Sequence, residues 1–322
     1  MPDLIVHIGF PKCASSTLQN QVFKKHKGYL GTHENLSMDK NMALQFKGVT
    51  PVGPRQWSNF CQAKKWADRV HKEYFNELSS LILSEEMLSN KNKFNALPII
   101  PFLEKFSKEI WTSGDLKVIV VLRNTAEIMA SSYSQNSAAN PYASQLNFER
   151  FIDSQLTKRV FRDYSVWISK LYAAFGKEKV CVLLMEDIDS NVFWQQLHAF
   201  CNLPEFQNKT KLMPKLNSKR KTKNSWEIAA FSPENKARVM AINLFGFIWP
   251  YFILSKYRNT AILFTKKKLS NHFTKKYLKA NETREDSFTL TEKHREKIES
   301  NLRSSTKILS ELLGRDMNAL GY

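Results

Sequence analysis

Short apolar runs alternate with longer stretches of helical periodicity over the first two thirds of the chain. Four runs of four to seven residues have the apolar character that a strand covered on both faces requires: Leu4–Gly9, Leu81–Ser84, Lys117–Leu122 and Lys179–Met185. Between them, Thr17–Lys25, Thr125–Gln135 and Asp163–Phe175 are long enough for crossover helices. The alternation predicts an open parallel α/β sheet, with ligands bound beyond the carboxyl ends of its strands.

The pattern changes near Phe206, beyond which the chain is basic, aromatic and helix-prone. We expect a single domain over residues 1–322, with an α/β core over residues 1–205 and an extension over 206–322 packed on it. A helix is predicted over Thr291–Leu313, with Gly314 as its stop. The side chains expected on its buried side are Ile298, Leu302, Ile308, Leu309 and Leu312.

Positive charge is concentrated in this extension. The chain carries a formal net charge of +18, and the stretch from Lys209 to Arg284 contributes +15 of it, with 18 Lys and Arg against three Glu. Such an excess attracts phosphates, acidic polysaccharides, nucleic acid or an anionic membrane, although a solvated basic face is the simpler interpretation. No helix-turn-helix, zinc-finger or RNA-recognition motif occurs, so we do not expect a nucleic-acid partner.

One stretch of the extension bears on membranes. Val239–Ser255 is uncharged over 17 residues, at the lower length limit for a span, and contains Gly246 and Pro250. A buried core helix is one interpretation. A second is an interfacial segment whose aromatic residues enter a bilayer while the lysines at 266–268 bind anionic headgroups. A membrane span is the third.

The cysteines and the first residues indicate a reducing compartment. Cys13, Cys61, Cys181 and Cys201 lack the close-paired spacing of a metal site, and three of them sit among apolar residues. Met1-Pro2-Asp3 runs directly into the first apolar run, with no basic segment and no apolar stretch of signal-peptide length. We expect a cytoplasmic protein that contacts the inner face of the membrane peripherally.

The loop after the first apolar run has the composition of a phosphate site. A strand, a loop and a helix start in this order present free backbone N–H groups and the positive helix end to an anion. Small side chains allow close approach, hydroxyls donate, and a lysine adds charge. The loop residues are Lys12, Cys13, Ala14, Ser15, Ser16 and Thr17. The GxxxxGK[ST] signature is absent, because the lysine comes early and there is no second glycine, which disfavours an ATP-dependent kinase.

The third apolar run supplies a second anion-binding candidate. Arg123 follows its end, and Ser131 comes eight residues later. If a helix begins near Thr125, Ser131 lies about two turns along it, and the arginine and serine can close on one phosphate.

These two motifs, PKCASST and RNTAEIMASSY, resemble the 5′-phosphosulfate loop and the 3′-phosphate motif of the sulfotransferase superfamily that uses 3′-phosphoadenosine-5′-phosphosulfate (PAPS). The resemblance covers residues 3–205 and is looser beyond. It implies a P-loop-like three-layer α/β fold with a central parallel sheet, here followed by a basic helical C-terminal extension. PAPS is the implied donor and 3′,5′-ADP (PAP) the product, with no metal required.

Departures from the family pattern indicate which branch of the family the chain resembles. Thr125 stands where proline often follows Arg-Asn. The basic-glycine motif of the small-molecule enzymes is missing, as is their histidine after the second strand. The chain reads Leu83-Ser84-Glu85-Glu86 there, which is similar to the carbohydrate-directed, bacterial-type enzymes that use a carboxylate as base.

The resemblance also implies roles for single residues. Lys12 stabilises charge on the leaving oxygen, and Glu86 acts as general base, preferred over Glu85 because it is third after the apolar end of the strand. Glu34, 22 residues after Lys12, is a rival base. Lys219 and Arg220 are assigned to the 3′-phosphate or adenine end of the donor, with a solvated basic cluster as the alternative.

We therefore expect transfer of a sulfonate to a carbohydrate hydroxyl, on a capsular polysaccharide, a lipopolysaccharide or a glycolipid. The rival functions are a P-loop nucleotide kinase and a non-enzymatic binder of anionic membrane or nucleic acid.

Overall fold

The structure is a computed structural model. It describes residues 2–10, 12–30, 60–74, 78–85, 99–112, 114–157, 163–202, 222, 224–237, 239–240, 267–274, 276–277, 282 and 284–322. The chain divides into two units. The first comprises Met1–Ile128, Val160–Asn217 and Asn301–Tyr322, and the second comprises Met129–Arg159 and Ser218–Ser300. The expected single domain with a boundary near residue 205 remains a prediction.

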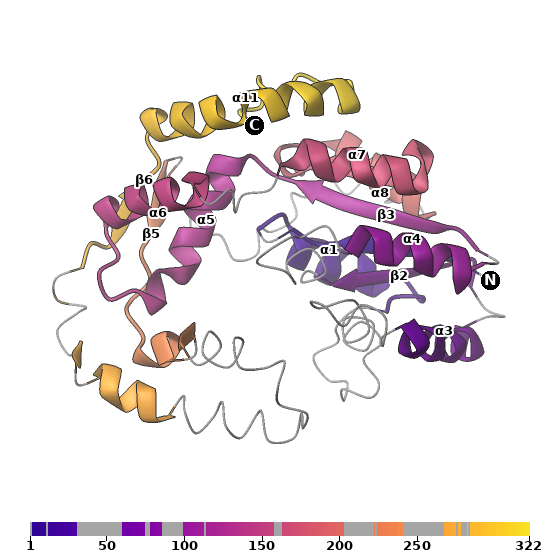
Figure 1. Cartoon of the computed structure of the whole chain (residues 1–322), viewed down its shortest axis with the longest axis horizontal. Helices are drawn as coiled ribbons and strands as arrows, with labels where there is room; N and C mark the ends of the chain where they lie inside the picture. Colours follow the sequence, from indigo (N-terminus) through magenta and orange to yellow (C-terminus); the bar gives the residue numbers. More distant parts are fainter. Residues whose placement is uncertain are drawn as a thin grey trace. The chain divides into compact units, whose positions relative to one another are not determined.

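The first unit is built on a four-stranded sheet in which all neighbouring strands are parallel. Its strands are β1 (Asp3–Ile8), β2 (Ser80–Glu85), β3 (Leu116–Leu122) and β4 (Val180–Leu184). Strands β2 and β3 are labelled in Figure 1. The strand order is β2-β1-β3-β4. The four predicted strands are confirmed, each to within one residue at either end, because burial on both faces leaves an unbroken apolar run in the sequence.

Helices cover both faces of this sheet. Those of the first unit are α1 (Ser15–Gln21), α3 (Phe60–Tyr74), α4 (Ile99–Glu109), α7 (Tyr164–Phe175) and α8 (Asn191–Cys201). His7 contacts Phe23, which follows α1, while Phe10 packs edge-on against Trp167 of α7. This is the expected three-layer α/β arrangement.

The second unit holds an antiparallel pair of short strands that the sequence did not predict. These are β5 (Ser225–Glu227) and β6 (Ser287–Thr289), with α6 (Gln145–Thr157) beside β6. The ring centroids of Phe148 and Phe288 are 4.3 Å apart, and Tyr133 meets Phe288 edge-on at 5.0 Å. The core of this unit is therefore aromatic.

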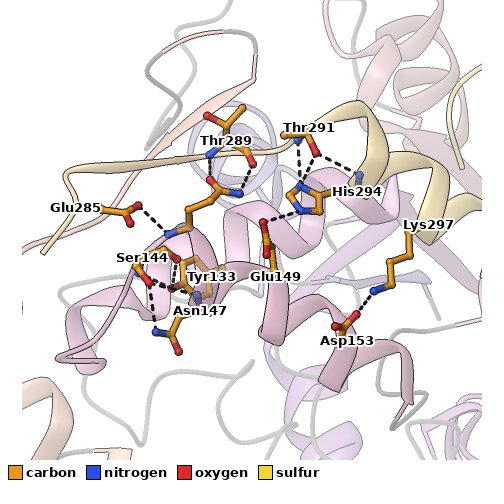
Figure 2. A network of polar contacts seen from close by, with 11 residues as sticks. Tyr133, Ser144, Asn147, Glu149, Asp153, Glu285, Thr289, Thr291, His294 and Lys297 are labelled. Carbon is orange, nitrogen blue, oxygen red and sulfur yellow. Dashed lines mark hydrogen bonds and ion pairs between the residues drawn. The ribbon is translucent and has the colours of Figure 1, made fainter.

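Polar contacts join α6 to the strand β6 and to residues on either side of this strand (Figure 2). The amide of Gln145 bonds both backbone groups of Thr289, and the Gln145 backbone N–H donates to Glu285. Further along, His294 lies 3.7 Å from Glu149, and Lys297 pairs with Asp153. These contacts fasten a segment near residue 290 to α6.

Two helices run through both units. α5 (Thr125–Asn136) follows β3, and α11 (Glu292–Leu313) occupies the range predicted for the last helix. Ile298 and Leu309 are buried as expected, and Leu302 and Leu312 are half-buried. The expectation for Ile308 is wrong, because this side chain is 47% exposed. Thr306, only 3% exposed, takes the buried position three residues before Leu309, which moves the apolar stripe off Ile308.

The three cysteines whose side chains are described, Cys13, Cys181 and Cys201, are buried and form no disulfide with one another, as expected of small core residues. Burial raises the pKa of Cys181 to about 12, so its thiol stays protonated and unreactive. None of the helices within the described ranges has the length and hydropathy that a membrane span requires. The interfacial segment predicted around Val239–Ser255 lies outside the described residues except for its first two.

A buried histidine joins the first two strands. His7 Nδ1 lies 2.8 Å from Ser84 Oγ, which also accepts a hydrogen bond from Gln19 of α1 at 3.1 Å. Burial lowers the pKa of His7 to about 4, so the imidazole is neutral in the folded protein. The pair ties β1, β2 and α1 together directly below the loop that follows β1.

This burial predicts a loss of stability in mild acid. The unfolded chain binds a proton at His7 near pH 6.5, whereas the folded chain does so only near pH 4. Stability from this group is therefore complete above pH 6.5 and lost as pH falls to 4, by about 3 kcal/mol at most. Urea unfolding at pH 7 and pH 4.5 measures it. In the His7→Gln protein the free energy of unfolding should change less between the two pH values. An equal change in the His7→Gln and wild-type proteins would contradict this assignment.

Candidate active site

The strand order places two loops beside each other at the carboxyl edge of the sheet. The chain passes from β1 outward to β2, and then returns to the other side of β1 to form β3 and β4. The order therefore reverses between β1 and β3, which is where open α/β sheets bind their ligands. Ile8 pairs with Val120 at the end of this ladder, so the segments from Gly9 and from Arg123 emerge next to each other.

The loop after β1 has an unusual backbone. Lys12 and Ala14 have φ values of 68° and 57°, in the left-handed region that residues other than glycine rarely adopt. Each such position costs on the order of 1 kcal/mol and persists where its surroundings enforce it, which happens most often at functional sites. The turn brings the N–H of Cys13 to the carbonyl oxygen of Phe10 at 3.3 Å. The sequence argument about small side chains did not anticipate this geometry.

The start of α1 leaves polar groups for a ligand. Ala14 is the N-cap residue and offers no side-chain acceptor to the first turn, so the backbone N–H groups there are uncapped. Ser15 is 3% exposed, and its Oγ has no hydrogen-bond partner among the described residues. Ser16 is half-buried and Thr17 is buried on the same helix. An anion with several acceptor oxygens fits this set of donors.

A direct contact joins the two predicted motifs. Nη1 of Arg123 donates to the carbonyl oxygen of Lys12 at 2.9 Å, although the residues are 111 positions apart. The Arg123 side chain is 15% exposed and lies 3.4 Å from Glu127 on α5. Its own carbonyl oxygen accepts from Tyr164 Oη at 3.2 Å. The structure thus brings the Arg123 side chain and the Lys12 backbone into contact at the switch point.

Asn124 begins the helix that carries Ser131. Its Oδ1 accepts from the N–H of Glu127 at 3.2 Å, and its carbonyl oxygen accepts from the N–H of Ile128. The helix start expected near Thr125 is confirmed. Ser131 is half-buried on α5, in the part of the helix that belongs to the second unit. Closure of Arg123 and Ser131 on one phosphate stays a prediction.

The side chains of the predicted bases and of the Lys219–Arg220 cluster are not among those that the structure describes. Glu85 is the last residue of β2, and its backbone pairs with Ile8, but its side chain is not among those described. Glu86 and Glu34 lie outside the described residues, as do Lys219 and Arg220. Within the described ranges, no group of three or more His, Cys, Asp and Glu side chains is arranged to hold a metal ion.

Sequence reasoning missed two residues that hold the Arg123 loop. Glu186, after β4, accepts the backbone N–H of Asn124 at 2.8 Å. Tyr164, at the start of α7, donates to the Arg123 carbonyl oxygen. Glu186 directly follows the fourth apolar run, so the rule that ligands bind beyond strand ends could have identified it. No local signal marked Tyr164.

The Ser15 hydroxyl, which has no hydrogen-bond partner among the described residues, leads to a prediction about stability. A buried hydroxyl without a partner costs free energy, so Ser15→Ala should raise the free energy of unfolding of the ligand-free protein by about 1 kcal/mol. The matched control is Ser165→Ala, which removes a buried hydroxyl that donates to Asp163 at 2.5 Å and should destabilise by about 2 kcal/mol. Urea unfolding measures both. A destabilised Ser15→Ala protein would show that the hydroxyl is satisfied.

Comparisons with known proteins bear on this site. A crystal structure of a sulfotransferase from Alicyclobacillus acidocaldarius is 14% identical, with 78% of this chain and 92% of that chain covered and a TM-score of 0.36. A likeness this weak carries no weight for function. No curated protein is significantly similar to the chain.

The family comparison is stronger. A family model described as a sulfotransferase domain matches residues 2–234, which is more than half of the chain. The matched range contains the whole four-stranded sheet, the loop with Lys12 and the strand end with Arg123. The candidate site at the β1–β3 switch point therefore lies within the matched domain, and the chain belongs to the sulfotransferase family.

Proposed function

We propose that this enzyme transfers the sulfonate of PAPS to a hydroxyl group of a carbohydrate, on a capsular polysaccharide, a lipopolysaccharide or a glycolipid. The observation that carries the proposal is the hydrogen bond from Arg123 to the Lys12 carbonyl oxygen. It joins the loop that resembles a 5′-phosphosulfate site to the strand end that resembles a 3′-phosphate site. A donor with an anionic group at each end of a nucleoside matches two adjacent cationic loops.

The residues present fit such a donor. The first turn of α1, which has no side-chain cap, and the Ser15 hydroxyl, which has no partner within the described part of the chain, supply hydrogen-bond donors. Lys12 and Arg123 supply positive charge. The guanidinium gives paired donors that suit phosphate oxygens. An acidic side chain near the Arg123 guanidinium, Glu127 at 3.4 Å, keeps the arginine oriented before the ligand arrives.

The donor supplies a sulfonate on a good leaving group, which departs as 3′,5′-ADP. The task of the protein is then positioning and electrostatics. Lys12 holds positive charge where negative charge develops on the leaving oxygen. Glu86 removes the proton of the acceptor hydroxyl, and Glu85 and Glu34 are the alternatives for this role.

A carbohydrate acceptor is favoured by two features of the sequence. The second strand ends in Ser84-Glu85-Glu86 without a histidine, as in the carbohydrate-directed branch that the chain resembles. The strongly basic stretch from Lys209 to Arg284 favours an acidic glycan.

Ligand-dependent unfolding tests the donor. At 100 times its Kd, 3′,5′-ADP should add about 2.7 kcal/mol to the free energy of unfolding. ATP and a DNA duplex at the same concentration should add much less, because the loop lacks the triphosphate signature and the chain lacks a nucleic-acid motif. Equal or greater stabilisation by ATP would favour a kinase, and stabilisation by DNA alone would favour a non-enzymatic binder.

Transfer of labelled sulfonate to a panel of glycans tests the acceptor and the base together. Label should enter at least one glycan and no small phenol. On that glycan, Glu86→Gln should lower kcat about 100-fold or more, the usual contribution of a general base. Glu85→Gln and Glu34→Gln are the matched controls and should retain most of the activity. Full turnover by the Glu86→Gln protein, or label in phenols alone, would contradict this assignment.

A further inference from the structure

Residues 314–322, called here the tail segment, follow α11 and pack against the strand ends of the first unit. Arg315 forms an ion pair with both carboxylate oxygens of Asp187, which follows β4. Met317 is fully buried, and Tyr322 is 3% exposed. The Thr306 hydroxyl of α11 donates to the Tyr322 carbonyl oxygen at 3.0 Å. The tail segment is therefore held at a fixed place beside the end of β4.

One carboxylate links the tail segment to the donor site. Tyr322 Oη donates to Glu186 Oε2 at 2.7 Å, while Glu186 Oε1 accepts the backbone N–H of Asn124 at 2.8 Å. Asn124 is the residue directly after Arg123. Burial raises the pKa of Tyr322 well above its ordinary value, so the phenol keeps its proton and remains a donor. The Tyr322 hydroxyl thus fixes the carboxylate that fixes the backbone next to Arg123.

The Asn124 side chain makes a second set of contacts with the tail segment. The Asn124 side-chain amide donates to the carbonyl oxygens of Leu320, at 3.3 Å, and Gly321. Tyr164, which donates to the Arg123 carbonyl oxygen, lies with its ring centroid 6.1 Å from that of Tyr322. The peptide unit between Arg123 and Asn124 is therefore held at its carbonyl oxygen by Tyr164 and at its N–H by Glu186, and both of these residues contact the tail segment.

Packing alone does not account for a phenol at this place. A phenylalanine at 322 would fill the same volume, and Glu186 would then lose a partner for one oxygen. The hydroxyl instead completes a chain of hydrogen bonds that ends one residue from the guanidinium. A misplacement of about 1 Å at a substrate-holding group weakens its contribution severely.

We propose that Tyr322, acting through Glu186, is a positioning residue that sets the backbone of Arg123–Asn124 for the anionic donor. The inference rests on the proposed function, since the donor is taken to be PAPS. It adds to that function a residue outside the matched family range of residues 2–234.

The test compares the Tyr322→Phe protein with wild type and with Tyr172→Phe, which alters a half-buried tyrosine eight residues further along α7 than Tyr164. Calorimetric titration should show that Tyr322→Phe raises the Kd for 3′,5′-ADP about fivefold or more, the lower end of the range for coupling between two sites. Tyr172→Phe should leave this Kd unchanged. The KM for PAPS should rise in parallel while kcat changes less than about twofold, because Arg123 binds the donor in ground and transition states alike.

Variants at Glu186 separate positioning from general stability. In Glu186→Ala, the added Tyr322→Phe change should have no further effect on Kd, because the tyrosine acts through the carboxylate. Glu186→Gln keeps an acceptor for the Asn124 N–H and should bind within about twofold of wild type. Hydrogen exchange of the peptide spanning residues 122–128 supplies a readout without nucleotide. It should be faster in Tyr322→Phe and in Glu186→Ala, and unchanged in Tyr172→Phe.

Two failures are distinguishable. Wild-type protein that does not bind 3′,5′-ADP contradicts the proposed function. Wild-type binding with unchanged Kd and unchanged hydrogen exchange in Tyr322→Phe overturns this inference alone, as does an equal loss of affinity in Tyr172→Phe.

Discussion

The hydrogen bond from the Arg123 guanidinium to the Lys12 carbonyl oxygen, 2.9 Å long, is the contact on which the site depends. It joins loops from β1 and β3 where the strand order reverses, and it accompanies left-handed backbone at Lys12 and Ala14. A cationic side chain that bonds a carbonyl oxygen of the neighbouring loop stabilises a backbone that is otherwise costly. The contact thus holds the loop after β1 in this conformation.

The surroundings of this contact are built to limit movement. Glu186 and Asn124 connect the ends of β3 and β4, and His7 and Ser84 connect β1 and β2 below the loop. Most of these groups come from strand ends, the part of a parallel sheet where neighbouring segments emerge together. Sulfonate transfer relies on positioning and charge more than on covalent help from the protein, which is the chemistry that a rigid cationic edge of a sheet serves.

The sequence predicted what local patterns encode. The four strands are unbroken apolar runs, and the Lys12–Arg123 neighbourhood follows from strand order and the rule for switch points. The contacts of Tyr322 escaped prediction, because Glu186 is 136 residues away and no local pattern pairs them. The strands β5 and β6 are three residues each and far apart in the chain, too short for a periodicity. Ile308 was wrongly predicted to be buried, because helical spacing locates the apolar stripe of a helix but not the edges of that stripe.

A crystal structure of the protein with 3′,5′-ADP tests the central claim most directly. The account predicts one phosphate at the first turn of α1, within hydrogen-bond distance of Ser15 Oγ and the Lys12 side chain, and the other phosphate bonded to the Arg123 guanidinium. A nucleotide bound elsewhere, or one that contacts a single loop while the other faces solvent, would contradict it.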